Sequence, residues 1–146
     1  MTRALLSVAL AIAFMAGVSA QDKPNFAGTW KSANSFNTWT ITVEGSKMTL
    51  TMTVAGNTSE PTVYLLDGTP STETMEGPNG PIKTVYTSKW EGDVLVTTIE
   101  APMMTRVERR SLEIDGTMKV ETAITMLQGK PGPPGGPPPM VLKRVK

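Results

Sequence analysis

Apolar and polar residues alternate in short runs along most of the chain after residue 20. Between Lys47 and Val54, for example, Met48, Leu50 and Met52 alternate with threonines. This two-residue period is typical of half-buried β-strands, and threonine suits their solvent-facing side because it is β-branched and polar. The pattern predicts strands over Ala27–Ser32, Phe36–Val43, Lys47–Val54, Pro61–Leu66, Ile82–Trp90, Val94–Glu100, Thr105–Ile114, Met118–Leu127 and Met140–Val145.

The connections between most of these runs are short and contain turn residues, such as Glu44-Gly45-Ser46 and Asp115-Gly116. Consecutive strands with short connections form an antiparallel up-and-down meander, and closing such a sheet removes its exposed edges. We therefore predict an all-β fold of eight or nine strands closed into a barrel. A two-sheet β-sandwich is the alternative.

Two segments are too rich in proline and glycine to continue the pattern. The polar stretch Thr69–Pro81 has these residues at several positions, and we predict a loop there. In the segment at residues 128–140, glycine does not recur at every third position as it does in collagen. We predict a solvated polyproline-II loop for this segment, with a docking site for an aromatic-lined partner as the alternative.

The N-terminus has the organisation of a cleavable signal peptide. Arg3 precedes an apolar run over Ala4–Gly17, and Val18-Ser19-Ala20 is a small-x-small cleavage site. The run is shorter than the roughly 20 apolar residues that cross a bilayer, which argues against the alternative of a membrane anchor. We predict that a signal helix over residues 1–20 is removed and that residues 21–146 form one domain. That domain would be exported to the periplasm or beyond the cell, without stable membrane insertion.

Composition excludes several classes of function. The chain has 14 Lys and Arg against 13 Asp and Glu, and since Arg3 leaves with the signal, the remaining 13 of each sign give no net charge. This balance argues against nucleic acid or an anionic membrane surface as the partner. The chain contains no cysteine and no histidine, which excludes disulfides, thiolate or imidazole metal sites and histidine-based catalysis. We predict a monomer that is not an enzyme and needs no cofactor or metal.

Three short motifs together resemble a known family. The segment Asn25–Lys31 contains Gly28-Thr29-Trp30, Trp90–Asp93 reads Trp-Glu-Gly-Asp, and Asp115-Gly116 forms a later turn. Their order is similar to that of small exported bacterial lipocalin-like proteins with a calycin-type barrel. The resemblance implies that Trp30 plugs the closed end of a barrel and that Arg144, in the last strand, covers its ring. An ordinary core aromatic is the alternative for Trp30.

Arg106, Glu108 and Arg110 lie on one face of a regular strand because they are two residues apart. Resemblance to small lipid-binding barrels implies that such arginines hold a ligand carboxylate inside the barrel. In the alternative, they lie at a solvated rim and Glu108 neutralises them. With Arg106 and Arg110, the predicted ligand-binding residues are Trp39, Tyr86 and Trp90.

These observations predict a carrier or sensor that binds a small hydrophobic or amphipathic molecule within the barrel. The apolar faces predicted to line the core or cavity contain Trp39, Ile41, Leu50, Met52, Tyr86, Trp90, Val94, Val96, Ile124 and Met126. The alternative is a structural or protein-interaction domain of the cell envelope whose core is filled.

Overall fold

The computed structural model describes residues 22–146, which form antiparallel strands and no helix. The predicted signal helix lies outside the described residues. Within residues 22–146 there is no helix that is long and apolar enough to cross a membrane. The strands are β1 (Gly28–Ser32), β2 (Thr38–Glu44), β3 (Lys47–Val54), β4 (Asn57–Thr58), β5 (Thr62–Leu65), β6 (Ser71–Gly77), β7 (Gly80–Glu91), β8 (Val94–Ala101), β9 (Met104–Leu112), β10 (Met118–Leu127), β11 (Lys130–Pro131) and β12 (Met140–Arg144).

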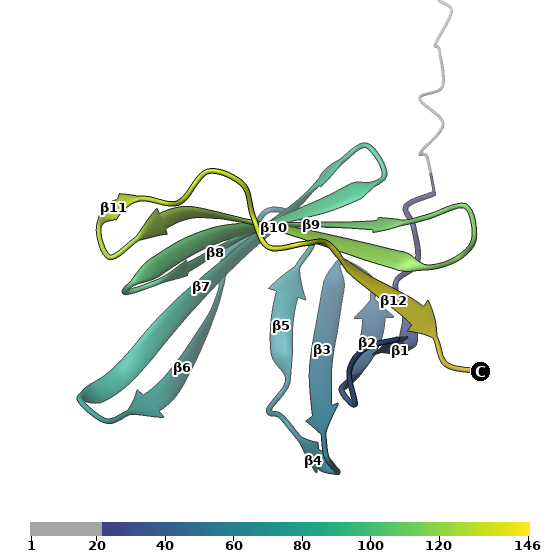
Figure 1. Ribbon diagram of the computed structural model, residues 1–146, viewed down its shortest axis with the longest axis horizontal. Helices are drawn as coiled ribbons and strands as arrows, with labels where there is room; N and C mark the ends of the chain where they lie inside the picture. The colour runs from purple at the N-terminus through teal and green to yellow at the C-terminus, as the bar shows by residue number, and fades with distance from the viewer. Residues whose placement is uncertain (1–21) are drawn as a thin grey trace, which may run out of the picture.

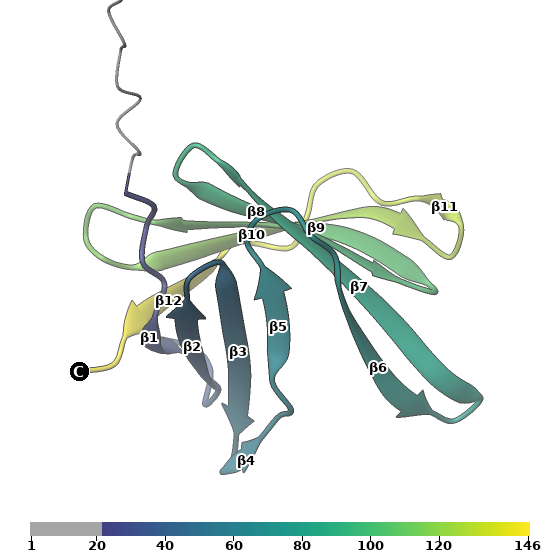
Figure 2. The same ribbon diagram turned by 180° about the vertical axis from the view of Figure 1, so that it is seen from behind.

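All strands in the described part of the chain belong to one 12-stranded sheet with the order β4-β3-β2-β1-β12-β10-β9-β8-β7-β6. Beside this path, β5 pairs with β3 and β11 pairs with β10. The last strand therefore inserts between β1 and β10, which joins the first and last strands of the described residues. Strands β8 to β10 run across one side of the molecule, and β2 to β5 and β6 to β7 descend from it as two walls (Figure 1; Figure 2 shows the reverse view).

The sheet does not close into the predicted barrel, because β5 and β6 form no ladder with each other. The chain between them turns away from β5: Gly68 donates its backbone N–H to Ser88 of β7 over 2.9 Å, and Pro70 has no N–H to donate. Contacts across this seam come from side chains, including the Ser71 hydroxyl, which donates to the Val63 carbonyl. The result is a single curved sheet that is open along one seam, and not two separate sheets.

The prediction of a loop over Thr69–Pro81 is wrong, since most of this stretch belongs to the β6–β7 hairpin. The sequence breakers lie where the hairpin tolerates them. Pro78 and Asn79 form the turn, and Gly80 adopts a φ of 111° that favours glycine. Pro81 lies in β7 at a point where that strand has no partner on its other side, because β7 pairs with β8 only from Val85 onwards.

The predicted facing of β8 is also wrong. Its register places Leu95 opposite Trp90 and Arg110 on the interior face, so Val94 and Val96 lie on the other face, where Val96 is nevertheless only 6% exposed. The strand begins with three apolar residues in a row, and alternation alone therefore does not distinguish its two faces. Pairing with β7 and β9 decides the facing.

The segment between β10 and β12 follows the edge of β10 that β12 leaves unpaired. Strand β12 pairs with β10 only over Met118–Val120, and Gly132 donates its N–H to Thr125 over 3.0 Å. A Cβ added at Gly132 would lie 1.9 Å from the Ile124 carbonyl oxygen, and one at Gly136 would lie 1.8 Å from the Thr122 carbonyl oxygen. The segment is exposed, but its glycines bring its backbone into contact with β10.

A buried cluster fills the half of the molecule where the chain enters the sheet. Trp30 is completely buried there, and its indole Nε1 donates to the Phe26 carbonyl over 2.9 Å. The buried members of the cluster are Phe26, Trp30, Ile41, Met48, Tyr64, Leu95, Met118, Val120 and Leu142. Several of these residues, including Ile41, Tyr64 and Leu142, also border an open space of the interior that lies beside the seam.

Candidate ligand-binding site

A cavity of about 980 Å³ lies within the curve of the sheet, which is the upper part of the size range of small-molecule sites. Its apolar side comes from β2, β3, β10 and β12, with Trp39, Ile41, Leu50, Met52, Met118, Val120, Met140 and Leu142. Its polar side comes from β6, β7 and β9, and its rim includes residues 59–62, which precede or begin β5. The cavity therefore contacts both strands that border the seam, β5 and β6.

Strand register brings the polar side chains of this site together. Tyr86 of β7 lies opposite Ile99 of β8, and Ile99 in turn lies opposite Arg106 of β9. Four residues further along β9, Arg110 lies opposite Leu95, which belongs to the buried cluster. Arg110 is therefore the deeper arginine, and Arg106 is nearer to the rim.

Arg106, Glu108 and Arg110 form a charged cluster on the interior face of β9. The Nε of Arg106 lies 3.2 Å from one carboxylate oxygen of Glu108, and an Nη of Arg110 lies 3.8 Å from the other. The exposed fractions of the side chains fall with depth, from 35% for Arg106 to 16% for Glu108 and 7% for Arg110. Glu108 thus shares its single negative charge between two guanidinium groups.

The cluster leaves buried donors without acceptors. The Nε atoms of Arg106 and Arg110 are buried and neither makes a hydrogen bond, although the first lies close to Glu108. A buried donor without a partner costs about 1 to 3 kcal/mol, and more when the group is charged. The guanidinium of Arg110 also lies 5.8 Å from the centre of the Tyr64 ring, a cation–π contact that offers no acceptor oxygen. The cluster therefore has capacity for a further anionic or acceptor group.

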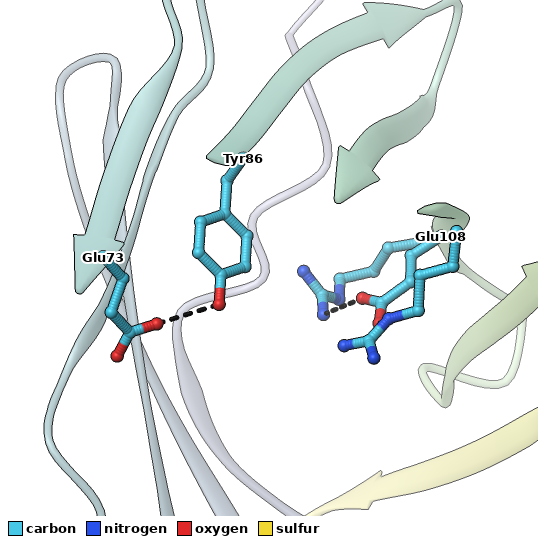
Figure 3. A network of polar contacts seen from close by, with 5 residues as sticks. Glu73, Tyr86 and Glu108 are labelled. Atoms are coloured by element: carbon cyan, nitrogen blue, oxygen red, sulfur yellow. Dashed lines mark hydrogen bonds and ion pairs between the residues drawn. The ribbon is translucent and has the colours of Figure 1, made fainter. Parts of the chain in front are cut away.

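Two tyrosines and a glutamate adjoin this cluster. Tyr86 of β7 and Glu73 of β6 lie on the same side of the seam as β9, and Tyr64 of β5 lies on the other side. The rings of Tyr64 and Tyr86 meet edge to face with their centres 5.3 Å apart, and the Tyr86 hydroxyl donates to Glu73 over 2.8 Å. In Figure 3, Tyr86 lies between Glu73 and Glu108. Burial and the neighbouring Glu73 carboxylate raise the pKa of Tyr86, and burial raises that of Tyr64. Both phenols are therefore neutral donors at neutral pH.

Four of the five predicted ligand-binding residues line the cavity, namely Trp39, Tyr86, Arg106 and Arg110. The fifth, Trp90, does not. Trp90 lies near the opposite end of β7, where its ring stacks on Phe26 at a centroid distance of 5.8 Å and Lys23 lies over it. It lines a separate pocket of about 520 Å³ beneath the entering chain, because four residues of strand separate it from Tyr86 along the same interior face.

The two residues predicted to plug the barrel are paired across β1 and β12. The guanidinium of Arg144 lies 4.5 Å from the centre of the Trp30 ring and donates to the backbone carbonyls of Ala27 and Asn25 over 2.6 and 3.3 Å. Gly28 makes this approach possible, since a Cβ there would lie 2.9 Å from Arg144 Nη1. Arg144 thus links the entering segment to the last strand.

Sequence reasoning did not identify Glu73 and Tyr64 as site residues. Glu73 falls in the stretch that was expected to be a loop, and Tyr64 lies in a strand of only four residues. Strand β6 has no apolar and polar alternation, and only the β-branched Thr72 and Thr74 favour a strand there. No group of three acidic side chains that would hold a metal ion occurs among residues 22–146.

Comparison with known proteins identifies the fold. No model of a protein family matches the chain, and no curated protein matches its sequence. Among solved structures, the REP1-NXSQ fatty acid transporter superposes with a TM-score of 0.57 at 16% identity, covering 82% of this chain and 96% of that one. A secretary abundant heat soluble (SAHS) protein from Ramazzottius varieornatus superposes with a TM-score of 0.56 at 12% identity, covering 82% and 95%.

These neighbours span most of the described strands at low sequence identity, so the likeness concerns the fold. It agrees in part with the resemblance to calycin-type barrels in the sequence. The chain has an all-β, lipocalin-like fold whose sheet is open along one seam.

Proposed function

We propose that this protein is an exported carrier or sensor that binds a small amphipathic molecule in the cavity beside the seam. The apolar part of the ligand would lie against β2, β3, β10 and β12, and an acceptor or anionic group would meet Arg106 and Arg110. Fatty acid transport in the name of one structural neighbour is consistent with this class of ligand.

The observation that carries the proposal is that Arg110 is buried with few partners for its charge. Its side chain is 7% exposed, its Nε has no acceptor, and its nearest carboxylate oxygen is 3.8 Å away and belongs to Glu108, whose other oxygen pairs with Arg106. A buried guanidinium with so little compensation is costly for folding alone. An anionic ligand group would satisfy it, and the planar donor fork of arginine suits carboxylate and phosphate oxygens.

The size of the cavity favours binding over a purely structural role. A structural or interaction domain of the cell envelope would fill its interior, because empty apolar space is destabilising. Here about 980 Å³ lies between apolar and charged walls within a chain of 146 residues. Export rests on the sequence of residues 1–20 alone, and a binding protein with no disulfide is compatible with that location.

The test is native mass spectrometry of the purified chain, followed by titration with a fluorescent fatty-acid probe and displacement by unlabelled amphiphiles. We expect saturable probe binding, and we expect Arg110→Met to weaken it at least about tenfold, as loss of a charge-assisted hydrogen bond does. Arg109→Met is the matched control, because Arg109 lies on the outer face and pairs with Glu91 over 3.0 Å. An absence of saturable binding, or equal effects of the two variants, would contradict the proposal.

A further inference from the structure

We infer that the preferred ligand carries both an anionic and a cationic group, in other words a zwitterionic head on an apolar body. This inference rests on the proposed function and specifies the chemistry of its ligand. It follows from the charges that line the cavity and from their order in depth.

The lining of the cavity has more negative than positive side chains. Its cationic members, within the described residues, are Arg106 and Arg110, and its acidic members are Glu60, Glu73, Glu76 and Glu108. The formal sum of these charges is −2 when all four carboxylates are ionised. A ligand that brings only negative charge would add to this excess, and like charges brought together at a site disfavour binding.

The positive and negative side chains lie at different depths in the cavity. Arg110 lies opposite Leu95 of the buried cluster, and Glu108 neutralises part of the charge of the two arginines. Glu73 projects from β6 to the hydroxyl of Tyr86, at the strand level of Arg106, and Glu60 and Glu76 are exposed where the cavity opens at the seam. An anionic group is therefore favoured at depth and a cationic group near the rim.

Both ends of such a ligand would find partners that the protein leaves available. The anionic group would accept from the buried Nε of Arg110, which has no hydrogen-bond partner, and from the guanidinium of Arg106, whose Nε makes no hydrogen bond although it lies 3.2 Å from Glu108. The cationic group would lie near Glu73, which accepts from the Tyr86 hydroxyl; aromatic rings such as those of Tyr86 and Trp39, which also line the cavity, attract cations through their quadrupoles. The acidic rim would also slow the entry of simple anions, because charges around an opening steer association.

Two pairs of probes with matched apolar parts test the inference by isothermal titration calorimetry at low salt. Lysophosphatidylcholine is compared with lysophosphatidic acid, and an acylcarnitine with the fatty acid of the same chain. We expect each zwitterion to bind about tenfold more tightly than its anionic counterpart, a ratio that falls as salt screens the rim. The two pairs also show whether phosphate or carboxylate suits the arginines better.

The acidic side chains near the opening of the cavity are then neutralised together by Glu60→Gln, Glu73→Gln and Glu76→Gln. These substitutions retain the size of each side chain and leave an oxygen acceptor for Tyr86. We expect the preference for zwitterions to fall to about threefold or less, mainly through tighter binding of the anions. Glu100→Gln is the matched control, because Glu100 is exposed on the outer face of β8.

The outcomes separate the inference from the proposed function. If the anions bind as tightly as the zwitterions, or if the rim variant leaves the ratio unchanged, the zwitterionic inference is wrong while an amphipathic ligand stands. If none of the four probes binds and the fluorescent fatty-acid probe also fails, the proposed function itself is wrong.

Discussion

Trp30→Ala is the substitution that tests most directly how the contact between the first and last strands, β1 and β12, stabilises the fold. Trp30 is completely buried, donates to the Phe26 carbonyl and lies under the Arg144 guanidinium at 4.5 Å. A buried tryptophan removes about 200 Å² from water, worth about 5 kcal/mol at 25 cal/mol per Å² as an upper value. Deletion of large aromatic side chains from cores costs about 3 to 5 kcal/mol. We expect a loss of stability in that range.

The assay is equilibrium unfolding in urea, followed by far-ultraviolet circular dichroism because the substitution removes a fluorophore. The matched control is Phe36→Ala, since Phe36 is 92% exposed and its removal should change the free energy of unfolding by less than about 0.5 kcal/mol. A loss below about 1 kcal/mol for Trp30→Ala, with an unchanged denaturant slope, would refute the assignment of Trp30 as a structural plug.

Three further substitutions or conditions test other parts of the account. Gly28→Ala should destabilise the protein by about 1 to 3 kcal/mol, because φ is 137° and the new Cβ would lie 2.9 Å from Arg144 Nη1; an unchanged urea midpoint would contradict this. Gly136→Ala should detach the proline-rich segment from Thr122 and speed its limited proteolysis, whereas an unchanged cleavage rate would show that the contact is unimportant. The stability of the protein should fall as the pH rises above 10.0, because the raised pKa of Tyr86 keeps it neutral when folded while its unfolded form ionises. Tyr86→Phe should reduce this decline between pH 8 and 11 in urea titrations, and an identical decline would exclude Tyr86 as a source.

Two strands with clear alternation could be predicted to the residue. Lys47–Val54 and Met118–Leu127 were expected from periodicity, and the structure gives the same bounds for β3 and β10. Both alternate over eight residues or more and begin after a turn that contains glycine, so local pattern and hairpin geometry agree. It was harder to predict which face of a strand points to the interior where the strand is apolar on both faces, as in β8.

The seam and most of the site depend on long-range pairing, which periodicity does not encode. Alternation placed Arg106 and Arg110 on one face, but burial of Arg110 follows from its position opposite Leu95. The approach of Glu73 to Tyr86 requires the β6–β7 hairpin, whose prolines and glycines were interpreted as a loop. The open seam depends on how the chain after β5 turns toward β7, which no local pattern in the sequence specifies.

The central claim is that an amphipathic ligand binds in the cavity beside the seam. An amide-proton and nitrogen NMR titration of the isotope-labelled protein with lysophosphatidylcholine, kept below its critical micelle concentration, tests it most directly. The account predicts saturating shifts concentrated at Tyr64, Tyr86 and residues 106–110, and none at Lys23 or Trp90 in the second pocket. Shifts confined to that second pocket, or no saturating shifts with either lysophosphatidylcholine or the fatty-acid probe, would contradict it.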